Sequence, residues 1–254
     1  MERMKPVLIK QSEIDERIII VSINRTEKLN SIHLELLESL QSELERINKV
    51  QHIKAVILTS ESLKAFSTGI DVHFVKELAN KEEVANFFYK LAHLFETVQQ
   101  LRVPTIAAVN GYAFGAGADL ALACDLRIAN EVASFRFPGP QFGVVLGIQR
   151  LISEVGGSTA RTLTLMNKLI DSKEALHDGV VHEVVSSANC LRRAEEWAKH
   201  LIEMPSFAKE TIRNMCNRVE RDLLMQDPCE LAKKSILAVD FNEAFEQYVA
   251  RIKK

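Results

Sequence analysis

The chain has 254 residues, which is enough for one large domain or two small ones with a substantial buried core. Hydrophobic residues make up 47% and charged residues 26%, as in ordinary globular proteins, and the formal net charge is −2. This near-neutral balance gives no electrostatic basis for binding nucleic acid or an anionic membrane, so neither is expected as a partner.

Four cysteines are present, and none forms a C-x-x-C pair or stands near a histidine cluster. Reduced thiols are therefore expected, with no zinc site, no other metal and no disulfide framework. The N-terminal residues 1–6 carry charge and lack the apolar core of a signal peptide. The apolar run at 18–21 is too short to span a membrane, so a cytoplasmic location is expected.

The first half of the chain alternates between strand and helix patterns. β-Branched residues predict a strand over 17–24, and apolar residues at helical spacing predict a helix over 31–50 with Ser31 as its N-cap. The next predicted elements are a strand over 53–59, a helix over 82–101, a buried strand over 105–110, and a turn over 111–117 that leads into a helix ending near Cys124.

The second half is mainly helical. Short strands are predicted over 126–129, 134–137 and 180–185, with helical patterns elsewhere from Gly143 onward. Alternating strands and helices indicate an α/β fold, and the helical segment 189–254 indicates an added helical region. Apolar residues in that segment have helical spacing that is typical of a core or a subunit interface; they include Phe241, Phe245, Tyr248 and Ile252.

Glycine is confined to the middle of the chain. All ten glycines lie between Gly69 and Gly179. Glycine is used where the backbone needs a positive φ or must approach something closely. Chemistry that depends on close backbone approach is therefore expected in this central region.

Two glycine-containing segments each lead from a strand or a loop into the start of a helix: 65–71 (AFSTGID) and 107–120 (AAVNGYAFGAGADL). The first N–H groups of a helix have no partner inside it and favour negative charge. A pair of such N–H groups suits the oxyanion of a thioester that passes through an enolate or a tetrahedral anion. A dinucleotide fingerprint would need a third glycine, and a P-loop would need Gly-Lys-Ser/Thr, so neither is favoured.

These segments resemble the enoyl-CoA hydratase/isomerase (crotonase) family. The family motifs N-R-P-E-K-x-N-A, F-x-x-G-x-D and A-V-x-G-x-x-x-G-G-G-x-E match 24–31, 66–71 and 108–119 in order, and 124–129 and 149–151 match as well. The resemblance covers nearly the whole chain. It implies an α/β fold with a ββα spiral core over 1–190 that binds acyl-CoA, and a helical trimerisation region over 191–254. It also implies assembly as a homotrimer or a dimer of trimers.

The resemblance implies roles for individual residues. Ile70 and Ala116 would supply the two oxyanion N–H groups, and Asp119 would be the catalytic acid and base. The residues expected near the substrate are Lys28, Phe66, Thr68, Asp71 and His73. Coenzyme A would be part of the substrate, so no separate cofactor is expected. The alternatives are a surface position for Lys28 and His73, and a helix-capping role for Asp119 and Asp71.

The chain departs from the family at its acidic positions. Asp119 is one methylene shorter than the family's glutamate, the second glutamate position holds Gly139, and a site that carries aspartate in some isomerases holds Gly147. Hydration needs one group to position water and another to deliver a proton, whereas a double-bond shift needs a single base. The leading hypothesis is an enoyl-CoA hydratase or isomerase with Asp119 as its only carboxylate. The alternatives are a decarboxylase or thioester hydrolase, or a non-catalytic acyl-CoA binder.

Overall fold

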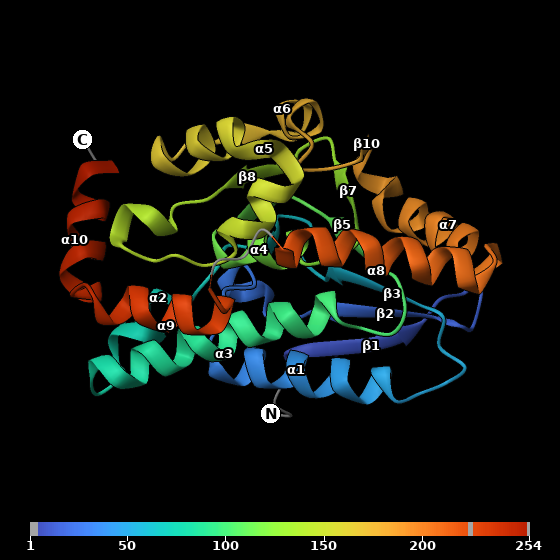
Figure 1. The fold of residues 1–254 in the computed structure, drawn as a ribbon, viewed down its shortest axis with the longest axis horizontal. Helices are drawn as coiled ribbons and strands as arrows, with labels where there is room; N and C mark the ends of the chain where they lie inside the picture. The colour runs from blue at the N-terminus through green and yellow to red at the C-terminus, as the bar shows by residue number, and fades with distance from the viewer. Residues whose placement is uncertain (1–4, 223–225, 253–254) are drawn as a thin grey trace.

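The computed structural model describes residues 5–222 and 226–252, so Lys253 and Lys254, which the sequence does not favour as phosphate ligands, lie outside the described residues. Its larger sheet has six strands in the order β1-β2-β3-β5-β7-β10 (Figure 1). β1 is antiparallel to β2, and the other neighbouring pairs of this sheet are parallel. The strands are β1 Val7–Gln11, β2 Ile18–Ile23, β3 Ala55–Ser60, β5 Thr105–Val109, β7 Leu126–Asn130 and β10 Glu183–Val185.

The smaller sheet has the order β4-β6-β8-β9 and is parallel except for its last pair. Its strands are β4 Ala65–Ser67, β6 Tyr112–Phe114, β8 Ser134–Arg136 and β9 Ile170–Asp171. The chain follows a strand of the large sheet with a strand of the small sheet and then a helix, and it does so three times in succession from β3 onward. This repeated path confirms the predicted α/β fold with a ββα spiral core.

The helices lie around these sheets and differ widely in length. The α-helices are α1 Leu34–Asn48, α2 Val72–Lys76, α3 Lys81–Gln99, α4 Ala116–Leu122, α5 Ile148–Leu165, α6 Ser172–Asp178, α7 Cys190–Glu203, α8 Ser206–Asp222, α9 Pro228–Leu237 and α10 Phe241–Ile252. Short 3₁₀ turns are η1 Thr26–Lys28, η2 Gly139–Phe142 and η3 Ser187–Asn189. No helix within the described ranges is long and apolar enough to cross a membrane.

The large sheet is buried on both faces because its side chains alternate between two apolar clusters. Val56 and Leu58 of β3 face the main core beneath α1 and α3, whereas Ala55 and Ile57 face α7. α7 presents small side chains at intervals of four residues to the sheet, namely Cys190, Ala194 and Ala198. Burial on both faces explains why these strands are nearly continuous runs of apolar residues.

Most predicted elements are confirmed, but the start of α1 is not. The predicted N-cap Ser31 is wrong: α1 begins at Leu34, after His33, which makes no side-chain cap. The residues before α1 pair with the loop before α2 instead, because Ile32 forms an isolated parallel bridge with Ile70. The Ser31 hydroxyl accepts a hydrogen bond from Arg25 Nη1 at 2.8 Å. Strands β1, β4, β6 and β9 were not predicted, and β6 lies inside the predicted turn.

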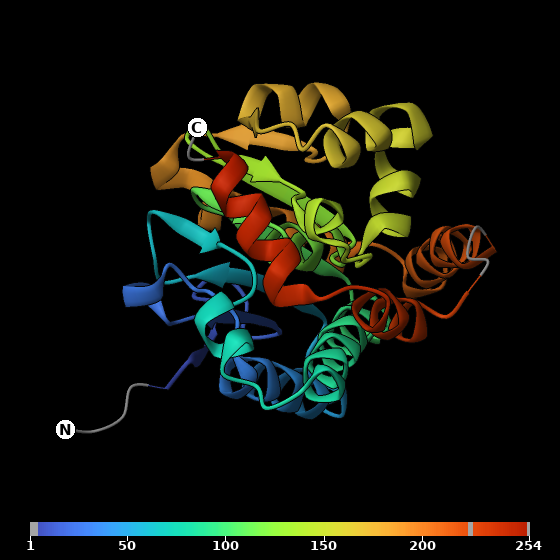
Figure 2. The ribbon, with the colours of Figure 1, turned by 90° about the vertical axis from the view of Figure 1, so that its left-hand side faces the viewer.

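The predicted helical C-terminal segment is confirmed by α7–α10. α9 packs along α3, and α10 stands at one end of the molecule in Figure 1 and crosses that end in Figure 2. Phe241 and Tyr248 are buried as predicted, whereas Ile252 is exposed. α10 therefore closes one side of the region where the two glycine-containing segments lie.

Candidate active site

The loop before α2 leaves the Ile70 N–H without a backbone acceptor among the described residues. Ile32 N–H donates to the Gly69 carbonyl at 2.7 Å, and Asp71 N–H donates to the Ile32 carbonyl at 2.8 Å. In such a parallel bridge the residue between these two groups turns its own N–H and C=O away from the neighbouring strand. The Ile70 N–H consequently points away from Ile32, to the other side of the loop.

The second N–H without an acceptor in the described part of the chain belongs to Ala116, the first residue of α4, which has no acceptor one turn earlier in the helix. Gly115 precedes it with φ 49° and ψ −123°, a conformation that only glycine adopts readily. Gly115 N–H donates to the Arg136 carbonyl at 2.8 Å and so joins the strand–helix junction to β8.

Two glycines bring these loops into contact. A Cβ built on Gly117 would lie 2.2 Å from the Ser67 carbonyl oxygen. A Cβ built on Gly69 would lie 2.7 Å from the Phe114 carbonyl oxygen and 3.3 Å from the Ala116 nitrogen. Any larger residue at either position would push the loops apart, so these glycines set the spacing of the Ile70 and Ala116 N–H groups.

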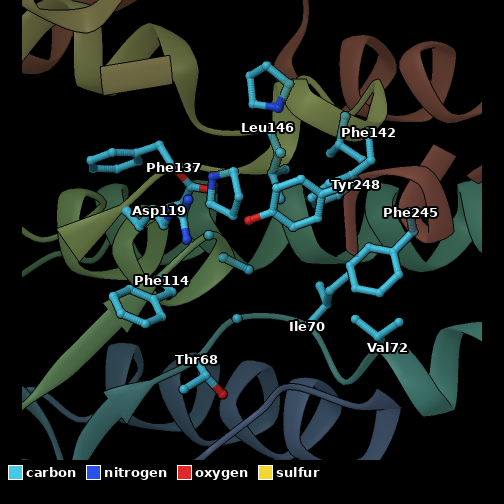
Figure 3. A pocket seen from close by; sticks show the side chains of 18 of the residues that line it. Thr68, Ile70, Val72, Phe114, Asp119, Phe137, Phe142, Leu146, Phe245 and Tyr248 are labelled. Atoms are coloured by element: carbon cyan, nitrogen blue, oxygen red, sulfur yellow. The ribbon is translucent and has the colours of Figure 1, made fainter. Parts of the chain in front are cut away.

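Ile70 and Ala116 border a cavity of about 220 Å³ whose other walls are mostly aromatic and aliphatic (Figure 3). The floor comes from the two loops, and α10 contributes Phe245 and Tyr248 on the opposite side. Asp119 is the only carboxylate among the lining residues. An apolar pocket with few polar groups is the usual form of a small-molecule site.

Asp119 lies three residues after Ala116 on α4, hence on the same side of the helix. It is 5% exposed, and its Oδ1 is buried without a hydrogen-bond partner among the described residues. Burial raises the pKa of Asp119 well above its ordinary value, and the Arg150 guanidinium opposes this only in part. The alternative capping role does not apply, because Gly115 is the N-cap of α4.

The structure brings Ile70, Ala116, Asp119 and Thr68 to this cavity. It places the other predicted substrate residues elsewhere. Lys28 is exposed on η1, the Phe66 side chain is wholly buried in the core, and His73 is exposed beside an outer groove between α2 and α10. Their roles toward a ligand stay predictions, and for Phe66 only the backbone could contribute.

Asp71 holds the loop that carries Ile70. Its carboxylate pairs with Arg25 Nη1 at 2.7 Å and accepts a hydrogen bond from the Phe74 N–H at 3.2 Å, which caps α2. Burial acts to raise the pKa of Asp71, but the hydrogen bonds from Arg25 and Phe74 outweigh it, so the pKa is lowered. Arg25 also donates to the Ser31 carbonyl at 2.9 Å, which links this loop to the 24–31 motif.

Replacing Asp71 by asparagine is expected to destabilise the protein by about 1–3 kcal/mol at neutral pH, because a charge-assisted pair is lost. Because the pKa of Asp71 is lowered by folding, the extra stability of the wild type over the variant is present above the unfolded-state pKa of aspartate. This extra stability disappears as pH falls through the folded-state pKa. Urea unfolding of both proteins from neutral pH to below pH 4 measures this. A stability difference that does not shrink in acid would contradict it.

The sequence interpretation missed the contribution of α10 to the site. Phe245 and Tyr248 were predicted as core or interface residues, yet both line the cavity. Arg136 on β8 lines it as well. Helical spacing marks an apolar face but does not say what that face covers. The Tyr248 hydroxyl, a polar group on this apolar face, was the one possible sequence signal that the face lines a ligand site.

Comparisons with known proteins agree with this geometry. The family model for enoyl-CoA hydratase/isomerase matches residues 13–250. The short-chain-enoyl-CoA hydratase of Clostridium acetobutylicum is 32% identical over 209 residues, covering 81% of this chain and 80% of that protein. The 2,3-dehydroadipyl-CoA hydratase of Escherichia coli is 33% identical over 205 residues, covering 78% and 79%.

Solved structures show the same fold. The enoyl-CoA hydratase of Bacillus anthracis superposes with a TM-score of 0.80 at 30% identity, covering 91% of this chain and 89% of that one. A monofunctional enoyl-CoA isomerase of M. smegmatis superposes with a TM-score of 0.73 at 26% identity, covering 87% and 97%. Proteins described as hydratases and as an isomerase are thus both among the similar proteins.

Proposed function

The chain belongs to the enoyl-CoA hydratase/isomerase family and is an acyl-CoA enzyme, and from this premise we propose that it shifts a proton next to the thioester carbonyl of its substrate. The Ile70 and Ala116 N–H groups would hold the carbonyl oxygen. Asp119 would take and return the proton. Coenzyme A enters as part of the substrate, and the proposal needs no separate cofactor.

The observation that carries the proposal is a pair of N–H groups with no acceptor among the described residues, in the same cavity as one buried carboxyl. Removing a proton next to a thioester places negative charge on the carbonyl oxygen, and each preset donor is worth about 3 kcal/mol of barrier to such an anion. The apolar walls exclude water and strengthen these interactions. Asp119, held in the same cavity with a raised pKa, is a stronger base once ionised than an exposed aspartate.

The walls favour a double-bond shift over hydration. Gly139 lines the cavity at the second acidic position and offers no side chain. Gly147 cannot hold an acid while Asp119 keeps its place, since its φ is +68° and a Cβ there would lie 2.4 Å from Asp119 Oδ1. A single carboxyl can move a proton between two carbons of one substrate, whereas syn addition of water calls for a second group.

The test is turnover of 3-enoyl-CoA and of crotonyl-CoA by the wild-type protein and by Asp119→Ala. Isomerisation of the 3-enoyl substrate by the wild type, lost in the variant, would support the proposal. Equal rates in both proteins would refute the role of Asp119. Release of CO₂ or free CoA from branched or dicarboxylic acyl-CoAs would instead favour the decarboxylase or hydrolase, and acyl-CoA binding without any turnover would favour a non-catalytic binder.

Assembly as a homotrimer or a dimer of trimers is part of the same proposal. α8 exposes three large apolar side chains: Phe207 is 83% exposed, Met215 63% and Ile212 54%. An apolar patch of this kind is typical of an interface between subunits. Sedimentation equilibrium is expected to give the mass of three or six chains, and a monomer at micromolar concentration would contradict the proposal.

A further inference from the structure

Tyr248 brings a second polar group into the cavity, from the wall opposite α4. It is 7% exposed, and Figure 3 shows its hydroxyl pointing into the cavity toward the side where Asp119 lies. Its ring packs against Phe142 and Phe245, with centroid separations of 5.6 and 6.1 Å. The direction of the hydroxyl is therefore set by packing before any ligand binds.

The hydrogen-bond network behind Tyr248 determines what its hydroxyl can do. Arg136 Nε donates to Asn167 Oδ1 at 3.0 Å, which identifies that atom as the amide oxygen. Asn167 Nδ2 must then be the donor in its long, 3.5 Å contact with the Tyr248 hydroxyl oxygen. The hydroxyl accepts from Asn167 and keeps its own hydrogen, which has no acceptor among the described residues.

From this network we infer that Tyr248 donates its O–H to an oxygen at C3 of the acyl group. The inference rests on the part of the proposed function that places the thioester oxygen at Ile70 and Ala116 and C2 at Asp119. It concerns which acyl-CoA ligands the cavity binds and is independent of the double-bond shift, because 3-enoyl-CoA has no oxygen at C3. With the thioester oxygen held by Ile70 and Ala116 and C2 of the acyl group facing Asp119, C3 would lie on the side of the cavity that Tyr248 lines. The ligand class so identified is an acyl-CoA that carries a 3-oxo or 3-hydroxy oxygen.

The arrangement supplies a neutral donor to a site that has lost its second carboxylate. Gly139, at the position of the lost carboxylate, contributes no side chain to the cavity wall, whereas Tyr248 contributes its hydroxyl from a different element, α10. A phenol donates a hydrogen bond without bringing in a second negative charge beside Asp119. The site would consequently bind acyl groups with an oxygen at C3 more tightly than saturated ones of the same length.

The experiment compares two ligands that differ at C3. Acetoacetyl-CoA has an oxygen there and butyryl-CoA has none, and calorimetry measures the affinity of each without requiring turnover. Tyr248→Phe is expected to weaken acetoacetyl-CoA binding about tenfold, as for the loss of one hydrogen bond, and to leave butyryl-CoA binding unchanged. Tyr89→Phe is the matched control, because Tyr89 lies on α3 outside the cavity.

Asn167→Asp tests the network without removing the hydroxyl. Arg136 would still be paired, but the second carboxylate oxygen would accept the Tyr248 proton and withdraw it from the ligand. The same selective loss of acetoacetyl-CoA affinity is expected, and unchanged butyryl-CoA binding shows that the pocket is intact. Aspartate tolerates the positive φ of 52° at this position.

The outcomes distinguish a failure of the Tyr248 role from a failure of the proposed function. If the wild type binds both ligands and Tyr248→Phe weakens neither, or weakens both equally, the role of Tyr248 is overturned and the proposed function stands. If Tyr248→Phe shows the selective loss but Asn167→Asp does not, the network is overturned as the cause. If the wild type binds neither ligand, the proposed function fails and the inference fails with it.

Discussion

Asp119→Asn is expected to lower turnover of the preferred enoyl-CoA by about 10²–10⁴-fold, the range of general acid–base catalysis. Asparagine keeps the size of the side chain but can neither take nor return a proton. The KM should change little, because in the proposed mode the thioester oxygen would be held by backbone N–H groups that the substitution leaves in place. Steady-state kinetics on 3-enoyl-CoA and crotonyl-CoA measure both parameters.

The same substitution has an expected effect on stability that depends on pH. The folded-state pKa of Asp119 is raised, so the native protein binds this proton more tightly than the unfolded chain does. Native stability is therefore full below the unfolded-state pKa of aspartate and falls as pH rises through the folded-state pKa. Asp119→Asn removes this loss, and the variant should gain stability relative to the wild type as pH rises.

These two measurements together exclude a trivial explanation. An inactive variant that is at least as stable as the wild type at neutral pH has not simply unfolded. Wild-type turnover retained by Asp119→Asn would remove Asp119 from the mechanism. A variant that loses stability at every pH would show that the buried carboxyl is held by interactions other than those described.

Gly147→Ala is expected to inactivate the enzyme nearly as completely as the loss of Asp119, although residue 147 carries no functional group. Its added Cβ would lie 2.4 Å from Asp119 Oδ1 and 2.9 Å from Asp119 Cβ, so the carboxyl must move. Displacing a catalytic group by about 1 Å costs on the order of 100-fold in rate. The variant should also be destabilised by about 1–3 kcal/mol through overpacking, beyond its backbone strain.

Gly156→Ala is the matched control. Gly156 has a similar positive φ of 72°, but a Cβ built there meets nothing within 4 Å. It would incur a backbone cost alone and should keep wild-type turnover. That cost is about 1–3 kcal/mol, because the ψ of 159° at Gly156 lies in a region that is essentially restricted to glycine. If both variants retain activity, the contact between Gly147 and Asp119 does not govern catalysis; if both lose it, backbone strain in α5 is responsible.

Three glycines have two different roles in this site. Gly69 and Gly117 let the two loops touch, which sets the separation of the N–H donors. Gly147 instead lies directly against the carboxyl of Asp119 and covers its Oδ1. The site is thus formed largely by backbone contacts that only glycine permits, with a single acidic side chain inside it.

Much of this could be predicted from the sequence because it depends on local pattern. β-Branched and apolar runs predicted β2, β3, β5 and α3 to within a few residues. The two glycine-containing segments predicted where the backbone would be exposed to a ligand, and the family motifs located Ile70, Ala116 and Asp119. These signals are local because the apolar periodicity of an element and the glycine turn before α4 are determined by neighbouring residues.

What only the tertiary structure decided is how distant segments meet. The position of Ser31 off the helix follows from a bridge to residue 70, and the burial of Asp119 follows from contact with residue 147. The face that α10 presents to the cavity, with Tyr248 and its partner Asn167, likewise depends on where the C-terminal segment packs against the rest of the fold. Such contacts join residues far apart in sequence, and spacing along the chain carries no information about them.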